Sequence, residues 1–152
     1  MIWTPRVTVA AIVEQNGRFL LVEEETDSGL GLNQPAGHLD EHESLLEGVA
    51  RETLEETGYS FRPDALIGVY LWHAPEKGLT YLRFAFSGTL VDHDPARPLD
   101  TGIVRTLWLT PAEVAAEMRR HRSPLVQRCI DDYRAGRRYP LELLNRLSGE
   151  DE

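Results

Sequence analysis

The sequence has little cysteine and little positive charge, and both shortages limit what the protein can be. Cys129 is the one cysteine among 152 residues, which excludes a disulfide within the chain. It lies in a segment that we expect to be helical, and we interpret it as a packed core residue rather than a nucleophile. The formal net charge is −9. A nucleic-acid polymer is therefore not an expected partner, because its binding needs a basic face.

Other features are also lacking. No group of His and Cys residues has zinc spacing, no apolar run approaches the length of a membrane span, and the first residues lack the layout of a signal peptide. We therefore expect a cytoplasmic protein without a membrane partner, either a monomer or a homodimer. The content of 41% hydrophobic and 27% charged residues is that of a globular protein. The length suits one domain over residues 1–152.

Short β-branched runs alternate with helical patterns along the chain. Strands are predicted over 6–13, 19–24, 34–38, 65–72, 81–91 and 103–109. The first two are joined by a hairpin turn at Asn16-Gly17, and loops are predicted over 26–32 and 93–100. Helices are predicted over 44–57, from the capping box at Thr110, and from Ser123 to near Gly136. This order indicates an α/β or α+β layered domain, in which helices pack on a mixed sheet.

The segment from Gly37 to Tyr59 is the most informative part of the chain, with seven acidic residues. Glu52, Glu55 and Glu56 stand at i, i+3 and i+4, so they share one face of a helix within an arc of about 100°. Like charges that close repel one another. A hard divalent cation such as Mg²⁺ turns this repulsion into binding and takes phosphate oxygens as further ligands. The spacing therefore predicts metal-dependent phosphate chemistry.

The same segment resembles the Nudix box, whose pattern is G-x5-E-x7-R-E-U-x-E-E-x-G-U with U apolar. The matching residues are Gly37, Glu43, Arg51, Glu52, Glu55, Glu56, Gly58 and Tyr59. Thr53 at the first U position is a mild departure. The stretches 33–40, 72–75, 122–126 and 138–142 resemble the NudJ-like phosphatase subgroup, so the similarity covers most of the chain. The resemblance implies a Nudix-like α/β/α sandwich with a mixed sheet.

The resemblance also implies a hydrolase of phosphoanhydride bonds. Expected substrates are nucleoside tri- or diphosphates, or small pyrophosphate esters such as a thiamine-precursor pyrophosphate. Mg²⁺, which Mn²⁺ can replace, would be held by Glu52, Glu55 and Glu56, with the Gly37 carbonyl as a further ligand. Glu52 is the favoured general base. The alternative is a non-catalytic Nudix-type module that senses a phosphorylated ligand, although such modules usually lose these glutamates.

Arg51 and Glu43 are expected to orient the catalytic carboxylates, and Arg51 is also spaced to pair with Glu47 and Glu55. Many Nudix enzymes have one more acidic residue before the tryptophan of the last strand, here Trp108. The residue that fills this role is left open, and none reaching the site is a further alternative. The candidates for it are Asp100, Asp94 and Glu76.

Substrate recognition requires cations and a ring-binding surface near the metal. Arg6, Arg83 and Arg122 are candidates to contact phosphate, because a guanidinium suits bidentate contacts. Arg83 lies in an alternating strand, so it faces either the interior or solvent. Trp72 is a candidate to stack a heteroaromatic ring, with a core position as the alternative. His38 follows the box glycine and is a candidate to touch phosphate, with a loop histidine that has no role as the alternative.

Overall fold

Two β-sheets form the centre of the molecule in this computed structural model, which describes residues 1–149. The first sheet has the strand order β5-β1-β7-β6. Its strands are β5 (Ala36–His38), β1 (Arg6–Ile12), β7 (Leu79–His93) and β6 (Tyr59–Ala74). Strands β1 and β7 are parallel, whereas the β1–β5 and β6–β7 pairs are antiparallel. The sheet is therefore mixed, which confirms the prediction.

The second sheet is built around β3. Its strands are β2 (Glu14–Gln15), β3 (Arg18–Thr26), β4 (Gly29–Asn33) and β8 (Ile103–Leu109). The predicted turn between the first strands is present, with positive φ at both Asn16 and Gly17. The prediction of a loop over 26–32 is wrong, because part of it pairs with β3 as strand β4. Thr26 closes this second hairpin by donating its hydroxyl to the Gly29 carbonyl at 2.6 Å, and Gly29 has a φ of +109°.

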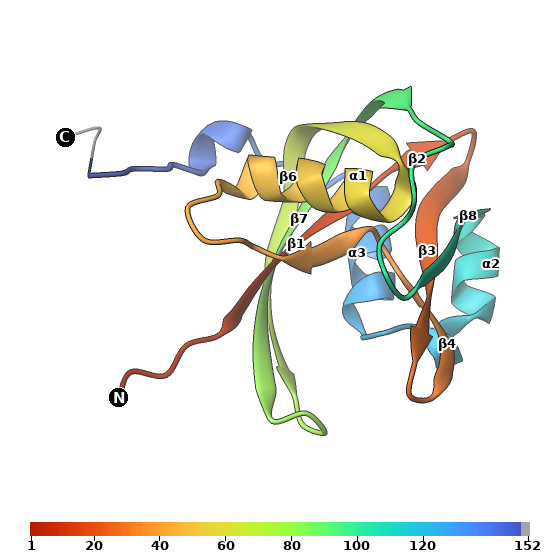
Figure 1. The fold of residues 1–152 in the computed structure, drawn as a ribbon, viewed down its shortest axis with the longest axis horizontal. Helices are drawn as coiled ribbons and strands as arrows, with labels where there is room; N and C mark the ends of the chain where they lie inside the picture. The colour runs from red at the N-terminus through yellow and green to blue at the C-terminus, as the bar shows by residue number, and fades with distance from the viewer. Residues whose placement is uncertain (150–152) are drawn as a thin grey trace.

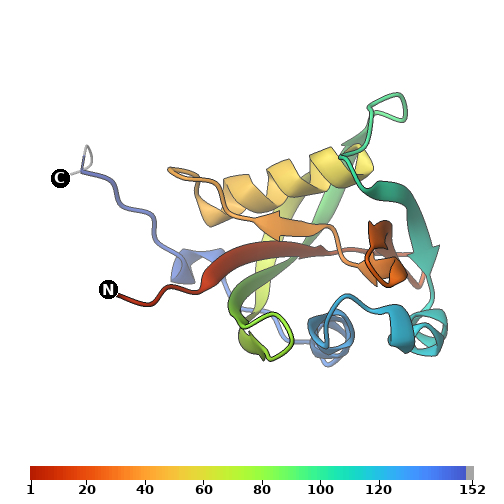
Figure 2. The same cartoon turned by 60° about the horizontal axis from the view of Figure 1, so that its bottom comes forward.

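Helices cover both faces of the first sheet (Figure 2). The helix α1 (Leu45–Thr57) lies on one face and α3 (Leu125–Arg134) lies on the other, whereas α2 (Pro111–Ala116) packs beside β8 and α3 (Figure 1). Short 3-10 helices are η1 (Met118–Arg120) and η2 (Leu141–Leu143). Neighbouring residues of β1 pack in hydrophobic cores on opposite faces of the sheet, because successive side chains of a strand alternate. Val9 packs in the core that contains Val49 of α1, and Ala10 packs in the core that contains Cys129 of α3.

Local signals fix the ends of α1. Ser44 is its N-cap and forms a capping box with Glu47, and Gly58 ends the helix in the left-handed region at a φ of +76°. The predicted helix over 44–57 is thus confirmed. Within residues 1–149 no helix combines the length and the apolar character needed to cross a membrane.

The β6–β7 hairpin is longer than predicted. Both strands extend beyond 65–72 and 81–91, because register shifts near Phe61, Pro63 and Gly68 accommodate irregular positions. The hairpin tip projects away from the body in Figure 1. Residues 94–100 form the loop that leads to β8, and this loop reaches α1 through a hydrogen bond from the Asp100 N–H to the Glu55 carbonyl at 2.9 Å.

Candidate metal and substrate site

Three carboxylates converge beside α1. Glu52, Glu55 and Asp100 each offer one oxygen, and these atoms lie within 4.8 Å of one another. The backbone hydrogen bond to Glu55 holds Asp100 at this position. Of the candidates that the sequence left open, Asp100 is therefore the one whose carboxylate lies beside Glu52 and Glu55 of α1. Glu76 lies exposed in the β6–β7 turn, and Asp94 accepts the Ala96 N–H at 3.1 Å instead.

Glu56 is not a member of this trio, and its side chain contacts strand β5. Its side chain accepts the Ala36 N–H at 2.8 Å, and the residue is 8% exposed. Burial raises the pKa of Glu56 to about 9, and the nearby negative charges of Glu24, Glu52 and Asp100 act in the same direction. The trio thus contains Asp100 in the place expected for Glu56, whose part in ion binding stays a prediction.

Gly37 makes room for Glu52. A Cβ at Gly37 would overlap the Glu52 carboxylate, so only glycine allows this carboxylate to lie against the β5 backbone. Burial raises the pKa of Glu52, and its hydrogen bond from Arg51 opposes that shift. The Glu52 carboxylate is partly buried and lies against the backbone of β5, so carboxylate and carbonyl oxygens are close together. Mg²⁺ binds oxygen ligands, so the residues present fit a divalent cation.

Arg51 donates hydrogen bonds to three glutamates of the Nudix box. Its Nε donates to Glu43 at 2.6 Å, and its Nη1 donates to Glu52 at 2.9 Å and to Glu55 at 3.2 Å. The hydrogen bond from Arg51 is the main reason that the pKa of Glu43 is lowered. The predicted pair with Glu55 is present. The pair with Glu47 is not formed among the described residues, because the Glu47 carboxylate accepts the Ser44 N–H in the capping box.

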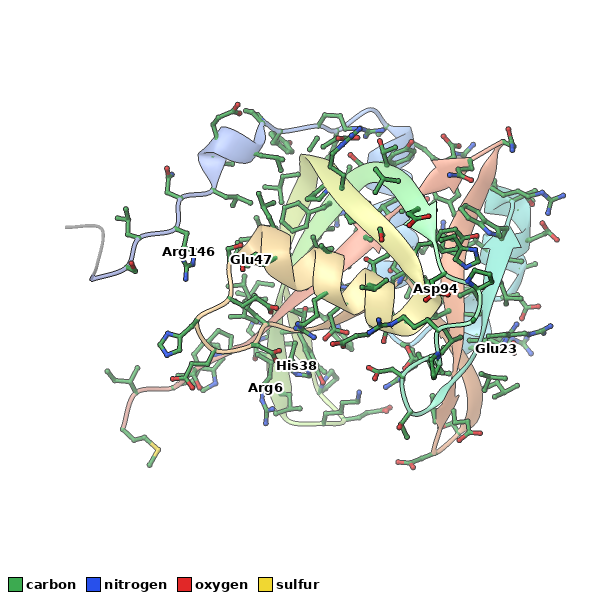
Figure 3. The ribbon with its side chains drawn as sticks, turned by 45° about the horizontal axis from the view of Figure 1, so that its top comes forward. Arg6, Glu23, His38, Glu47, Asp94 and Arg146 are labelled. Atoms are coloured by element: carbon green, nitrogen blue, oxygen red, sulfur yellow. The ribbon has the colours of Figure 1, made fainter. Side chains whose placement is uncertain are left out.

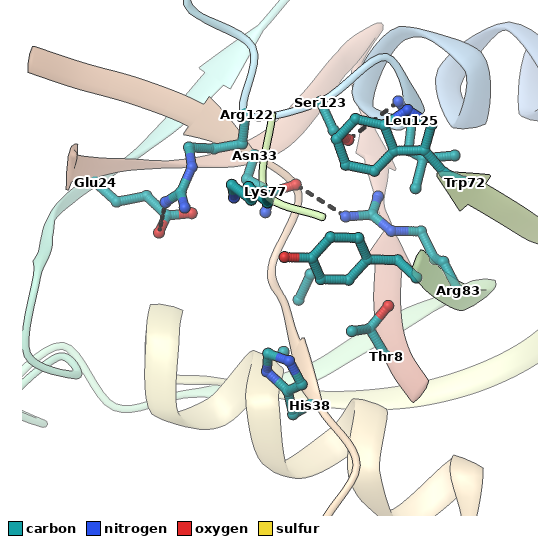
Figure 4. A pocket seen from close by; sticks show the side chains of 13 residues that line it. Thr8, Glu24, Asn33, His38, Trp72, Lys77, Arg83, Arg122, Ser123 and Leu125 are labelled. Atoms are coloured by element: carbon teal, nitrogen blue, oxygen red, sulfur yellow. Dashed lines mark hydrogen bonds and ion pairs between the residues drawn. The ribbon is translucent and has the colours of Figure 1, made fainter. Parts of the chain in front are cut away.

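A cavity of about 210 Å³ lies next to the carboxylates, with Gly37 in its wall (Figure 4). Its lining includes His38, Trp72 and Arg83, three of the residues predicted to bind substrate. Arg6, another of these candidates, is exposed at the outer start of β1 (Figure 3) and is not part of this lining. Arg122 also lines the cavity, but its guanidinium pairs with Glu24 at 2.7 Å.

Aromatic rings and a buried cation line this cavity. The rings of Trp72 and Tyr81 are stacked, with centroids 5.6 Å apart at 18°. Lys77 Nζ lies 5.8 Å from the Tyr81 centroid. Arg83 is 5% exposed, which decides between its two predicted orientations in favour of the interior.

Asn33 and Gln34 are site residues that sequence reasoning missed. Arg83 donates to both of their side-chain oxygens. The available signal was a pair of amide residues in the stretch 33–40, shortly before Gly37. Their contact with a charged strand residue becomes visible only in the folded sheet, where β1 pairs with β5 on one side and with β7 on the other.

A mixed sheet between helices, with two glutamates of α1 and a loop aspartate forming a carboxylate trio, is the arrangement of a Nudix hydrolase. The NUDIX domain model matches residues 4–129. The chain therefore belongs to the Nudix hydrolase family and is an enzyme that acts on phosphorylated substrates. This family typically uses a divalent metal ion, and the acidic trio is the matching feature of the chain.

Individual relatives agree with this assignment. The chain is 43% identical over 140 residues to "Phosphatase NudJ" of Escherichia coli strain K12, covering 92% of this chain and 90% of the relative. A solved NUDIX hydrolase from Nitrosomonas europaea has 52% identity and a TM-score of 0.93, covering 96% of this chain and 99% of that one. A MutT protein from Methanosarcina mazei Go1, at 22% identity, TM-score 0.72 and coverages of 91% and 100%, shares the fold.

Proposed function

We propose that the protein uses Mg²⁺, or Mn²⁺ in its place, to hydrolyse phosphoanhydride bonds. The proposed substrates are nucleoside tri- or diphosphates, or small pyrophosphate esters such as a thiamine-precursor pyrophosphate. The observation that carries the proposal is the convergence of Glu52, Glu55 and Asp100 within 4.8 Å. The relationship to a phosphatase NudJ over most of both chains supports a substrate of this kind.

In this proposal Glu52, Glu55 and Asp100 hold the ion, and the Gly37 carbonyl and Glu56 are further ligands. The bound ion supplies charge neutralisation at phosphate oxygens and a lowered pKa for water. Excess negative charge in the trio favours binding, because Arg51 is the one cation that the described residues place in ion-pair contact with Glu52 and Glu55.

Glu52 is the proposed acceptor of the proton from the attacking water. Its carboxylate is oriented by Arg51 at 2.9 Å, and Arg51 is oriented in turn by Glu43. A general base must lie within hydrogen-bond reach of the proton that it removes, so the orientation of its carboxylate contributes directly to the rate. Arg51 and Glu43 are therefore proposed to position the catalytic carboxylates.

The cavity of Figure 4 is the proposed place of the group that remains attached to the phosphates. Trp72 and Arg83 line it and His38 stands at the box end, so these residues are proposed to bind substrate. Arg6 is proposed to contribute positive charge from the outer end of β1. The cytoplasmic location, the single domain, and the choice between monomer and homodimer stay predictions.

The proposal is tested by incubating the protein with Mg²⁺ and a panel of nucleotides and pyrophosphate esters, with release of phosphate and pyrophosphate as the measurement. Turnover of at least one compound is expected, with loss of turnover in Glu52→Gln and Glu55→Gln. The exposed Glu142 provides the matched control, because Glu142→Gln changes the same group far along the chain in η2. Turnover that survives both box substitutions contradicts the proposal. Ligand binding without any turnover favours the sensing module.

A further inference from the structure

Arg83 is a buried cation with an unusual set of partners. Its Nη1 donates to the Gln34 side-chain oxygen at 2.9 Å, and its Nη2 donates to the Asn33 side-chain oxygen at 3.2 Å. Its Nε is buried and has no hydrogen-bond partner among residues 1–149. No described carboxylate lies within ion-pair distance of this guanidinium. Nε therefore lacks an acceptor and the positive charge lacks a counter-charge within the described protein, and a bound ligand would supply them.

Gln34 fixes the position of the Arg83 guanidinium without neutralising its charge. Gln34 is 1% exposed, and its Nε2 donates to the Val126 carbonyl of α3 at 2.8 Å. This second bond fixes the carboxamide so that its oxygen faces Arg83. A glutamate here would neutralise the guanidinium. The neutral amide orients Arg83 and leaves its charge uncompensated.

The sheet places Arg83 on the face opposite the box helix. Arg83 is the register partner of Thr8, which in turn is the partner of His38, and these three residues line the cavity. The adjacent Phe84 packs in the core that contains Val49 of α1. Since side chains of a strand alternate, Arg83 and the carboxylate trio lie on opposite faces. The group that meets Arg83 is therefore a part of the substrate other than the bond to be cut.

The surroundings of Arg83 select the chemistry of that group. Trp72 and Tyr81 provide a flat stacked surface in the same cavity, which suits a planar ring. Nη1 donates to Gln34 and contacts Cys129 Sγ at 4.0 Å, Nη2 donates to Asn33, and Nε is the one guanidinium nitrogen that has no partner among the described residues. One donor beside an aromatic surface matches one acceptor on the edge of a ring, whereas an oxyanion is best held by a fork of two donors.

We propose that Arg83 recognises a ring nitrogen or ring carbonyl on a heteroaromatic group of the substrate, and that Gln34 is a positioning residue for this contact. The inference rests on the proposed function, because it concerns the substrate of the same site. It makes Arg83 and Gln34 determinants of specificity for the non-reacting end of the substrate, with no part in the cleavage step.

Four esters that differ only in whether and where the ring carries a nitrogen test the inference. The three isomeric pyridylmethyl pyrophosphates carry a ring nitrogen at different positions, and benzyl pyrophosphate carries none. We expect at least one isomer to exceed the benzyl ester in kcat/KM by about tenfold, the effect of one hydrogen bond to a charged group, mainly through a lower KM. Equal values for all four esters overturn the inference.

Two variants assign the preference to its residues. Arg83→Met removes the donor, and Gln34→Met removes the group that orients it. Both are expected to abolish the preference by lowering kcat/KM for the favoured pyridyl ester more than for benzyl pyrophosphate, whereas a general structural defect would lower kcat/KM for all four esters by the same factor. Arg62→Met and Gln15→Met are matched controls, since both positions are exposed and outside the cavity lining. A preference that persists in both test variants overturns the inference.

A measurement without metal separates this inference from the proposed function. In EDTA, calorimetry compares the wild-type protein's binding of pyridylmethyl phosphates with its binding of benzyl phosphate. Tighter binding of one pyridyl isomer supports recognition by Arg83 even if no ester is cleaved, and in that case only the proposed function fails. Cleavage of all the esters with equal binding of the ligands leaves the proposed function standing and overturns the inference.

Discussion

The carboxylate of Glu52 lies so close to Gly37 that a methyl group on Gly37 would overlap it. Because the overlapped atoms are the end of a flexible side chain, Gly37→Ala is expected to displace Glu52 and leave the fold intact. A misplaced ligand carboxylate lowers metal-dependent activity by about 10- to 100-fold. Measurements of kcat/KM and of the melting temperature check this. Gly149→Ala is the matched control, since a Cβ there meets nothing within 4 Å. A large loss of thermal stability with normal activity would contradict the expected separation.

Asp100 is expected to act with the box glutamates. Asp100→Asn should raise the Mg²⁺ concentration needed for half-maximal activity, because it removes one charge from a trio that lies within 4.8 Å. Asp94→Asn and Glu76→Gln serve as controls, since both residues lie outside the trio. A Mg²⁺ titration of activity distinguishes the three variants. If Asp94→Asn shifts the titration more than Asp100→Asn does, the assignment of the late carboxylate is wrong.

Arg51 and Glu43 are expected to be strongly coupled. Two hydrogen bonds join them, at 2.6 and 3.0 Å, and the Glu43 side chain is 12% exposed. A double-mutant cycle with Arg51→Met and Glu43→Gln should give a coupling free energy above about 1 kcal/mol in denaturant unfolding. The exposed pair of Arg62 and Asp64, at 3.4 Å, is the control and should give less than about 0.5 kcal/mol. Equal coupling in both pairs would contradict an orienting role.

Acid should weaken the contribution of Glu23. This residue is 3% exposed and accepts hydrogen bonds from Arg105 at 2.9 Å and Arg120 at 2.6 Å, which lower its pKa below the ordinary value of 4.5. A carboxyl whose pKa is lower in the folded state stabilises the fold above its unfolded pKa, and this contribution is lost as the pH falls through the folded pKa.

Glu23→Gln should therefore lower the free energy of unfolding at neutral pH, by about 1–3 kcal/mol. The difference from the wild type should shrink as the pH is lowered from 4.5. Denaturant unfolding at a series of pH values measures it. A difference that stays constant or widens in acid would show that the two arginines do not lower the pKa of Glu23.

The parts of the fold that follow from local signals could be predicted from the sequence. Ser44, Glu47 and Gly58 cap α1 within a single segment, so the helix and its three glutamates were predictable together. Strand β4 was not, because Gly29 and Gly31 have low strand propensity. This strand forms because β3 offers it a partner edge, and such pairing overrides propensity.

The residues of the site also differ in how far the sequence predicts their positions. The spacing of Glu52, Glu55 and Glu56 is set by one helix, whereas Asp100 joins through a loop whose path depends on β7 and β8. The alternation of side chains along the strand left two possible orientations for Arg83, toward the interior or toward solvent. The packing of α3 on the sheet determines which of them is buried, and a polar residue such as Gln34 carries no sequence signal for burial.

The most direct test of the central claim is a crystal structure determined with Mn²⁺, with anomalous difference density calculated at the manganese absorption edge. We expect a peak within coordination distance of Glu52, Glu55 and Asp100, and its loss in Glu55→Gln. The contrary result would be density elsewhere on the molecule, with the three carboxylates remaining free of manganese at a concentration that supports activity.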